Sequence, residues 1–319
     1  MRNLRIVFMG TPEFAVGALG CLLMNGLNVS GVVTAPDKQA GRGKKVSKPP
    51  VKIFAENYKL PVLQPSNLKD EAFINELNNF NADLFVVVAF RMLPEVVWKM
   101  PPMGTINLHA SLLPDYRGAA PINHAIINGE TITGVTTFYI NEKIDTGNIL
   151  LREEVHIFPF DNAGDLHDRL MKSGARLLMK TLSLLSDGKI KPFPQSTPDK
   201  GIIIKPAPKI YPADCIINWN DDPVKIHNLI RGLSPQPCAR TFFKNEKGTL
   251  LIKIFESYPE VESHDLKPGS IKSDGKMFLK IACINGFVNI ASLQVEGRSR
   301  MSTSDFLRGF SISDFTIPA

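Results

Sequence analysis

The sequence predicts an α/β protein, with a doubly wound, mostly parallel sheet followed by a small β-rich domain. Near the N-terminus, an apolar run at residues 6–9, an amphipathic segment and a second apolar run at residues 29–34 have the spacing of a βαβ unit. Residues 84–89 are apolar throughout, as in a strand covered on both faces. Beyond residue 209, short strands alternate with glycine-containing turns, a pattern typical of a small β-barrel or sandwich.

The other elements are predicted from hydrophobic periodicity and from the positions of capping residues, glycines and prolines. Thr11 and Pro12 predict the N-cap and first position of the first helix, and Asp161 predicts the cap of a helix that ends near residue 185. Glycines and prolines at residues 35–50 favour a loop without regular structure. Helical periodicity covers residues 51–58, 68–77, 119–127 and 223–231, and further strands are expected at residues 104–109, 134–140, 149–157, 249–257, 276–284 and 287–293.

A proline-rich segment divides the chain. Five prolines fall within residues 189–209, which is typical of a linker. We therefore predict a first domain at residues 1–189, a linker at 190–208 and a second domain at 209–319.

Composition excludes several functional classes. No apolar run approaches the ~20 residues of a membrane span, so no membrane partner is expected. Four scattered cysteines without a C-x-x-C pair predict a reducing compartment and no disulfide framework, and the histidines form no ligand cluster, so we expect no metal. Gly10 is followed by Thr-Pro-Glu rather than by a G-x-x-G pattern, which argues against a nucleotide cofactor.

Three polar residues stand where predicted strands give way to loops. Asn107 and His109 are two apart in one strand and should project from the same face. Asp145 follows the next strand and could orient the imidazole of His109. An amide can stabilise a developing oxyanion and an imidazole can move a proton, so the three together favour acyl chemistry. Taken singly, each residue is more often structural.

Covalent catalysis has little support in the sequence. Ser111 follows an alanine and is not part of a G-x-S-x-G elbow, and Cys21 lies on a predicted helix with no sign of activation. Direct transfer without an enzyme-bound intermediate fits these residues better.

The net charge of +6 includes a basic cluster in the loop at residues 35–50. Its members are Lys38, Arg42, Lys44, Lys45 and Lys48. Such a cluster is either a solvated surface or a contact for a polyanion, and composition alone favours the solvated surface.

Several motifs together resemble the methionyl-tRNA formyltransferase family of folate-dependent enzymes. They are residues 8–15 (FMGTPEFA), 40–45 (AGRGKK), 107–114 (NLHASLLP), 116–122 (YRGAAPI), 145–147 (DTG), 207–210 (APKI) and 293–297 (LQVEG). The N-x-H motif with a later D-T-G is shared by folate-dependent formyltransferases in general. The G-R-G-K-K loop and the second domain indicate the enzyme that acts on tRNA.

The resemblance implies a Rossmann-like catalytic domain and an OB-fold-like barrel that binds tRNA. It implies 10-formyltetrahydrofolate as formyl donor and the α-amine of methionyl-initiator tRNA as acceptor, giving the formylated tRNA used in translation initiation. The implied catalytic residues are Asn107, His109 and Asp145, with the first two stabilising the tetrahedral intermediate. The implied folate-binding residues are Ser111, Leu112, Leu113, Pro114, Phe90, Arg91, Met92 and Leu93. The implied tRNA contacts are Arg42, Lys38, Lys44 and Lys45. We expect a monomer in the cytoplasm.

Two rival functions remain open. A formyltransferase for a small amine, such as glycinamide ribonucleotide or an amino sugar, would share the three catalytic residues without needing the basic loop or the barrel. A folate- or RNA-binding module without turnover would suit the barrel alone. The chain also departs from the family pattern at Asp115, at His124 and in the 234–237 segment, which lacks a common tryptophan.

Overall fold

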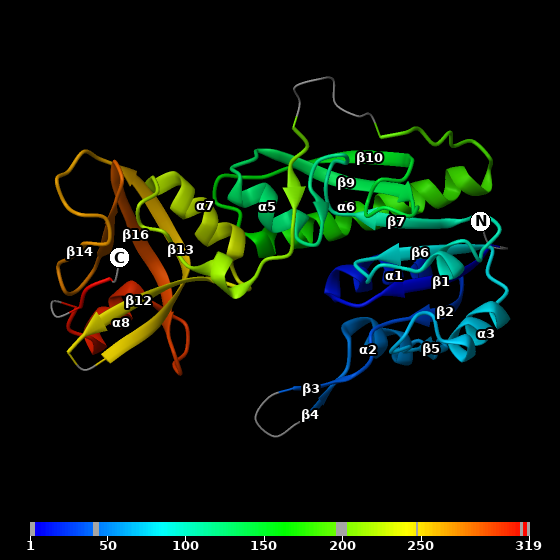
Figure 1. The fold of residues 1–319 in the computed structure, drawn as a ribbon, viewed down its shortest axis with the longest axis horizontal. Coiled ribbons are helices and arrows are strands. Elements are labelled where there is room, and N and C mark those ends of the chain that lie inside the picture. Colours follow the sequence, from blue (N-terminus) through cyan, green and yellow to red (C-terminus); the bar gives the residue numbers. More distant parts are fainter. Residues whose placement is uncertain (1–3, 41–44, 196–202, 247, 313–314, 318–319) are drawn as a thin grey trace. The chain divides into compact units, whose positions relative to one another are not determined.

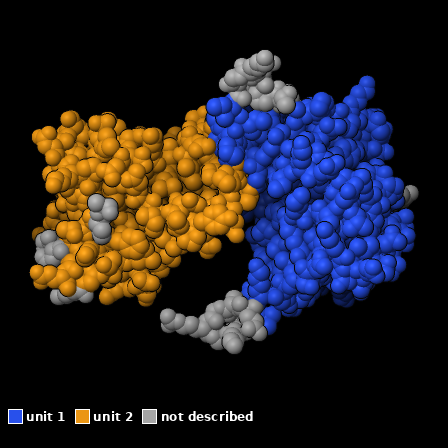
Figure 2. All heavy atoms as spheres, in the orientation of Figure 1, with its two compact units in different colours: residues 1–118, 132–156, 167–206 blue, residues 119–131, 157–166, 207–319 orange. Residues whose placement is uncertain are grey.

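The computed structural model describes residues 4–40, 45–195, 203–246, 248–312 and 315–317, without the side chains of residues 39, 40 and 45. The chain forms two compact units (Figure 2). Unit 1 comprises residues 1–118, 132–156 and 167–206, and unit 2 comprises residues 119–131, 157–166 and 207–319. Residues 119–131 and 157–166 thus belong to the unit that holds the C-terminal residues, although both stretches precede the predicted linker. The predicted domain limits stay a prediction.

A seven-stranded sheet forms the centre of unit 1, in the order β10-β9-β7-β6-β1-β2-β5 (Figure 1). Its strands are β1 (Arg5–Gly10), β2 (Asn28–Val33), β5 (Val62–Leu63), β6 (Leu84–Val88), β7 (Thr105–His109), β9 (Ile132–Tyr139) and β10 (Ile149–His156). The strands from β7 to β5 run parallel, whereas β9 is antiparallel to β7 and to β10. The predicted Rossmann-like, mostly parallel sheet is confirmed.

The strand order explains where a site can form. The chain builds the sheet from β1 to one side through β2 and β5, then returns to the other side of β1 with β6 and β7. Ligands of open α/β sheets bind beyond the carboxyl ends of the strands at such a reversal. All five residues of β6 are buried, which agrees with the continuous apolar run in the sequence.

The helices of the first 200 residues are α1 (Glu13–Met24), α2 (Pro50–Asn57), α3 (Glu71–Asn79), α4 (Glu95–Trp98), α5 (Pro121–Ile127) and α6 (Ala163–Ser186). Two predicted caps are wrong. Helix α1 is preceded by Pro12 at the N-cap with no side-chain cap, so Thr11 lies one residue too early. At α6, Asn162 Oδ1 accepts the N–H groups of Gly164 and Asp165, whereas Asp161 accepts from the Phe158 N–H.

The basic segment contains regular structure where none was predicted. Strand β3 (Lys38–Ala40) pairs antiparallel with β4 (Lys45–Ser47), so the prediction of an irregular loop is wrong. The base of this hairpin is held from outside it. Lys52 Nζ lies 2.7 Å from Asp37 Oδ2, and the amide of Gln64 donates to Asp37 Oδ1 and to the carbonyl of Ala35 at 2.8 Å each.

Unit 2 contains an antiparallel sheet in the order β12-β13-β16-β15-β14, with β17 paired to β16. Its strands are β12 (Ala239–Asn245), β13 (Gly248–Val261), β14 (Ile271–Ser273), β15 (Leu279–Cys283), β16 (Gly286–Val295) and β17 (Met301–Ser302). The long strands β13 and β16 lose register near Glu256, as expected for a sheet that curls. This curled sheet confirms the predicted OB-fold-like second domain.

The remaining elements of the chain are short or pack beside this sheet. They are β8 (Arg117–Gly118), β11 (Pro206–Ala207), the 3-10 helix η1 (Pro212–Cys215), α7 (Pro223–Leu233) and α8 (Thr303–Gly309). Ile226 and Ile230 of α7 and Phe306 of α8 join the buried core of unit 2. None of the helices in the described ranges is long and apolar enough to cross a membrane.

Candidate active site

Strand β7 carries two of the three predicted catalytic residues. Asn107 pairs with Val87 of β6 and Phe138 of β9, and His109 follows two residues later, on the same face. His109 is 7% exposed, whereas Asn107 is half-buried. Within the described part of the chain, the side-chain amide of Asn107 has no hydrogen-bond partner. It is therefore free to bind a ligand.

The imidazole of His109 is held by one hydrogen bond and faces a carboxylate on its other side. Nε2 lies 2.8 Å from the carbonyl oxygen of Tyr116. A carbonyl oxygen only accepts, so Nε2 carries the hydrogen. Nδ1 lies 3.8 Å from Oδ2 of Asp145. A second proton on the ring would thus face the carboxylate.

Asp145 lies in the loop between β9 and β10, with its side chain 14% exposed. Its Oδ2 atom accepts the backbone N–H of Gly118 at 2.9 Å. The backbone of Asp145 has a φ of +52°, a left-handed conformation that few residues other than glycine adopt. The structure therefore brings Asp145 and His109 together by means of a constrained turn.

Sequence reasoning missed several groups that hold these residues. The carbonyl of Tyr116 and the N–H of Gly118 are backbone atoms, which no side-chain pattern reveals. Gln195 donates to the carbonyls of Asp145 and Gly147 at 2.9 Å each and accepts from Arg117. Gln195 lies in the segment predicted as a linker, and no sequence signal distinguished it.

The implied folate-binding segment after β7 is anchored to β9 and β10. Thr136 Oγ1 donates to the carbonyl of Ser111 at 2.7 Å and accepts from the Leu113 N–H at 3.2 Å. Arg152 donates to the carbonyl of Leu113 at 2.9 Å, and the Leu113 side chain is fully buried against Phe138. Leu112 and Pro114 are half-buried, and Ser111 is fully buried.

The segment after β6 begins at Ala89, which also has a positive φ of +47°. Arg91 donates to the carbonyls of Pro65 and Ser66, and burial lowers the pKa of its guanidinium. Phe90 is half-buried and Met92 is 65% exposed, whereas Leu93 packs into the core of unit 1. The residues from Ala89 to Met92 thus present surface to a ligand, whereas Leu93 does not.

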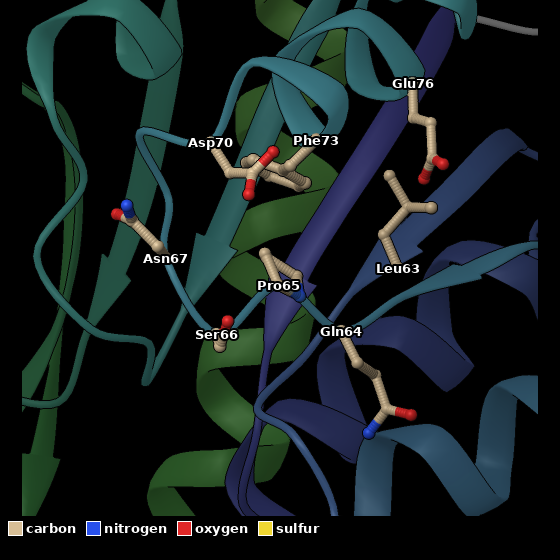
Figure 3. Close-up of a pocket in the computed structure, with 8 residues that line it drawn as sticks. All are labelled: Leu63, Gln64, Pro65, Ser66, Asn67, Asp70, Phe73 and Glu76. Carbon is tan, nitrogen blue, oxygen red and sulfur yellow. The ribbon is translucent and has the colours of Figure 1, made fainter.

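A polar cavity of about 270 Å³ lies beside the segment that Arg91 contacts (Figure 3). It is lined by Leu63, Gln64, Pro65, Ser66, Asn67, Asp70, Phe73 and Glu76. None of the three predicted catalytic residues lines it, so the structure does not join it to the site on β7.

The predicted tRNA contacts are only partly within the described residues. Lys38 begins β3 and is exposed, and the backbone of Lys45 begins β4. Arg42 and Lys44 lie outside the described residues. Hydrogen bonds from Gln64 and Lys52 lower the pKa of Asp37, so the base of the hairpin holds an ionised carboxylate.

The four cysteines offer no activated nucleophile. All are free thiols, and burial raises the pKa of each, to about 11 for Cys238 and Cys283. Because the thiolate is the reactive form, none is poised to attack a carbonyl at neutral pH. No group of His, Cys, Asp and Glu within the described ranges could hold a metal ion.

Comparison with known proteins shows the family to which the chain belongs. The family model described as formyl transferase matches residues 4–182, and the model of the formyl transferase C-terminal domain matches residues 209–311. A methionyl-tRNA formyltransferase of Bacteroides fragilis is 51% identical over 313 residues, covering 98% of this chain and 97% of the relative. One of Flavobacterium johnsoniae is 51% identical over 314 residues, with 98% of each chain covered. The chain belongs to the methionyl-tRNA formyltransferase family. Membership of this family confirms the enzyme class expected from the sequence.

Solved structures share the fold of this methionyl-tRNA formyltransferase family member at lower identity. A sugar 3N-formyltransferase, WlaRD, solved in the presence of dTDP and 5-N-formyl-THF, is 21% identical with a TM-score of 0.65, covering 93% of this chain and 99% of that one. An N-formyltransferase from Helicobacter canadensis, in complex with folinic acid and dTDP-3-aminofucose, is 22% identical with a TM-score of 0.63, covering 90% and 98%. At these identities the likeness concerns the fold alone.

Two positions that the sequence analysis singled out, Asp115 and His124, have hydrogen-bond partners. Asp115 Oδ1 accepts the backbone N–H of Lys205 at 3.0 Å. Nε2 of His124 lies 3.0 Å from the carbonyl oxygen of Pro208. Each side chain therefore anchors a segment of its own unit.

Proposed function

We propose that this protein transfers the formyl group of 10-formyltetrahydrofolate to the α-amino group of methionyl-initiator tRNA. The observation that carries this proposal is the similarity to curated methionyl-tRNA formyltransferases, which extends over both units at about half of all positions. The placement of Asn107, His109 and Asp145 at the carboxyl end of β7 and in the loop after β9 agrees with it.

The site residues suit direct transfer. Asn107 would donate its amide hydrogens to the formyl oxygen as negative charge develops there, and a protonated His109 would assist. Asp145 would hold the imidazole and help a water molecule to relay the proton lost by the attacking amine to N10 of the folate, as the bond between N10 and the formyl carbon breaks. The unpartnered amide of Asn107 and the ring held between Tyr116 and Asp145 support these roles. The raised thiol pKa values support transfer without a covalent enzyme intermediate.

The donor would bind along the two segments that follow β6 and β7. Exposed Met92 and half-buried Phe90 offer an apolar and an aromatic surface, and the backbone of Ser111 and Leu113 is rigidly anchored by Thr136. Buried Leu93 would support this surface from behind. A folate pterin ring is flat and polar at its edge, so a surface of this kind suits it.

Recognition of the tRNA would depend on charge. The hairpin β3–β4 carries Lys38, with Arg42, Lys44 and Lys45 following in sequence, and its base is held by the Asp37–Lys52 pair. Basic side chains on phosphates make affinity fall as salt rises. Unpaired ends are the part of an RNA that side chains read most readily, so Arg42 suits the acceptor end. We place the enzyme in the cytoplasm, acting as a monomer.

One assay tests the function directly. The purified protein is incubated with 10-formyltetrahydrofolate labelled in the formyl group and with methionyl-initiator tRNA, methionyl-elongator tRNA or a nucleotide-linked amino sugar. We expect label on the initiator tRNA alone. Label on the amino sugar would overturn the proposal in favour of a small-amine enzyme, and binding without transfer to any acceptor would indicate a module without turnover.

An Arg42→Ala variant tests the recognition loop in the same assay. We expect at least a tenfold higher KM for the tRNA, equivalent to about 1.4 kcal/mol of binding free energy, with an unchanged KM for the donor. Lys180→Ala, which removes an exposed lysine from α6 in the same unit, is the matched control and should behave like the wild type. Unchanged discrimination between initiator and elongator tRNA in Arg42→Ala would refute the role of Arg42.

A further inference from the structure

The segment around Gln195 is built into unit 1. Phe193 forms an antiparallel bridge with Ile149, the first residue of β10, through hydrogen bonds of 2.8 and 3.0 Å between their backbones. This bridge brings the side chain of Gln195 to the turn that contains Asp145. The glutamine is half-buried there. Residues 193–195 therefore continue the edge of the sheet into the candidate active site.

The amide of Gln195 uses its full hydrogen-bonding capacity. Its Nε2 group donates to the carbonyl of Asp145 and to that of Gly147, each at 2.9 Å. Its Oε1 atom accepts from Nε and Nη2 of Arg117 at 3.1 and 2.6 Å. Only a side chain with two N–H donors and a carbonyl acceptor can bind all of these groups at once. A carboxylate at this position has no hydrogen to donate, so its oxygens would repel the two carbonyl oxygens.

The turn that Gln195 contacts needs external support. Asp145 has a φ of +52°, a conformation that costs a non-glycine residue about 1–3 kcal/mol. At Gly147 a Cβ atom would lie 1.6 Å from the carbonyl oxygen of Tyr139, so the backbone passes very close to β9. Such a turn persists only where surrounding contacts hold it. The two carbonyl contacts from Gln195 supply such a hold.

The same connection reaches the carboxylate of Asp145. Arg117, which binds Gln195, is followed by Gly118, whose N–H donates to Asp145 Oδ2. The backbone of Asp145 and its side chain are thus held by one continuous set of hydrogen bonds. His109 Nδ1 lies 3.8 Å from the same oxygen.

We propose that Gln195, together with Arg117, is a positioning residue that fixes the direction of the Asp145 carboxylate toward His109. This inference rests on the proposed function for the part that concerns turnover. Gln195 has no contact with the reacting atoms in this scheme. It acts through Asp145 alone, and that dependence makes the proposal testable.

Steady-state kinetics of Gln195→Ala and Gln195→Glu give the first test. We expect each change to lower kcat by about 10- to 100-fold, since a misplacement of about 1 Å costs a rate factor of this order. The KM for the formyl donor should change less than twofold. Asn25→Ala is the matched control, because its amide also donates to a backbone carbonyl in unit 1 but lies at the end of α1. Unchanged kcat in both Gln195 variants would overturn the proposal.

A double-mutant cycle separates positioning from general loss of structure. In an Asp145→Asn background, Gln195→Ala should lower kcat less than twofold, because the carboxylate that it positions is already gone. The same 10- to 100-fold loss in both backgrounds would mean that Gln195 acts independently of Asp145 and would overturn the inference.

Amide hydrogen exchange gives a readout that needs no turnover. In Gln195→Ala, the N–H of Gly118 should exchange at least fivefold faster, because its acceptor is no longer held, while the amides of β6 keep the wild-type rate. An unchanged rate at Gly118 would overturn the inference. If the wild-type protein fails to formylate methionyl-tRNA, the proposed function fails, yet the exchange at Gly118 still decides whether Gln195 holds Asp145.

Discussion

Nδ1 of His109 lies 3.8 Å from Oδ2 of Asp145, and that oxygen already accepts the N–H of Gly118. The other ring nitrogen donates to the carbonyl of Tyr116, so the imidazole can take up a proton only on the side that faces the carboxylate. The proton-binding side of the ring and the negative charge are therefore placed together. This relationship links the two residues in any proton movement that the site performs.

The first prediction concerns the charge of Asp145. Asp145→Asn keeps the size of the side chain and an oxygen for the Gly118 N–H, but it removes the charge that faces His109. We expect kcat to fall by about 10²–10⁴, the range of assistance by a positioned acid or base. The measurement is single-turnover formylation at saturating donor. Asp187→Asn, on an exposed loop where the carboxylate pairs with Lys189, is the control and should keep full activity.

The second prediction concerns the amide of Asn107. Asn107→Ala removes the proposed oxyanion donor, so we expect kcat to fall by about 10²–10³. Donor affinity, measured by equilibrium titration with a non-reactive folate, should change little because the amide acts mainly on the developing charge. Asn289→Ala, an asparagine of strand β16, serves as the control for removal of a strand amide. A large loss of folate affinity with normal turnover of bound substrate would reverse the assignment.

The structure explains why some elements were predictable from sequence and others were not. Strand β6 is buried along its whole length, and its continuous apolar run has no competing interpretation. The hairpin β3–β4 was missed because its support comes from Lys52 and Gln64, which are distant in sequence from Asp37. Local glycine and proline patterns carry no information on such contacts.

Some residues of the candidate site could likewise be predicted from the sequence, and others could not. Asn107 and His109 could be predicted because a strand has a strict period of two. The sequence could place Asp145 at the end of a strand, but it could not predict how far its side chain lies from His109. That distance depends on a turn of positive φ, which no residue pattern around Asp145 encodes. Gln195 could not be found at all, because it reaches the site across fifty positions of sequence from a proline-rich segment.

The third prediction concerns the turn itself. Gly147→Ala would place a Cβ atom 1.6 Å from the carbonyl oxygen of Tyr139, so the backbone must move. We expect a loss of about 1–3 kcal/mol in the free energy of unfolding, typical of overpacking, together with at least a tenfold lower kcat. Urea unfolding and formylation assays measure the two effects. Gly309→Ala is the control, because apart from its chain neighbours and the backbone of its own helix no atom lies within 4 Å of its Cβ position.

The fourth prediction concerns pH and His227 of α7. Burial and the nearby guanidinium of Arg231 lower the pKa of His227 to about 4, and its Nδ1 lies 3.2 Å from the Ser257 hydroxyl. In the unfolded chain, a histidine has a pKa of about 6.5. Between pH 6.5 and pH 4, His227 is therefore protonated in the unfolded chain but mostly neutral in the folded protein. The free energy of unfolding must fall as pH decreases from about 6.5 to about 4.

The size of this effect can be isolated by substitution. His227→Gln keeps a hydrogen-bond partner for Ser257 but cannot titrate. Between pH 7 and pH 4, the unfolding free energy of the wild type should therefore fall by on the order of 2 kcal/mol more than that of the variant. Buried Trp219 reports on unit 2 by fluorescence, in a Trp98→Phe background that removes the other tryptophan. Exposed His156→Gln should follow the wild-type curve. Parallel curves for His227→Gln and the wild type would mean that protonation of His227 does not destabilise unit 2, because a group with the same proton affinity in both states contributes no slope.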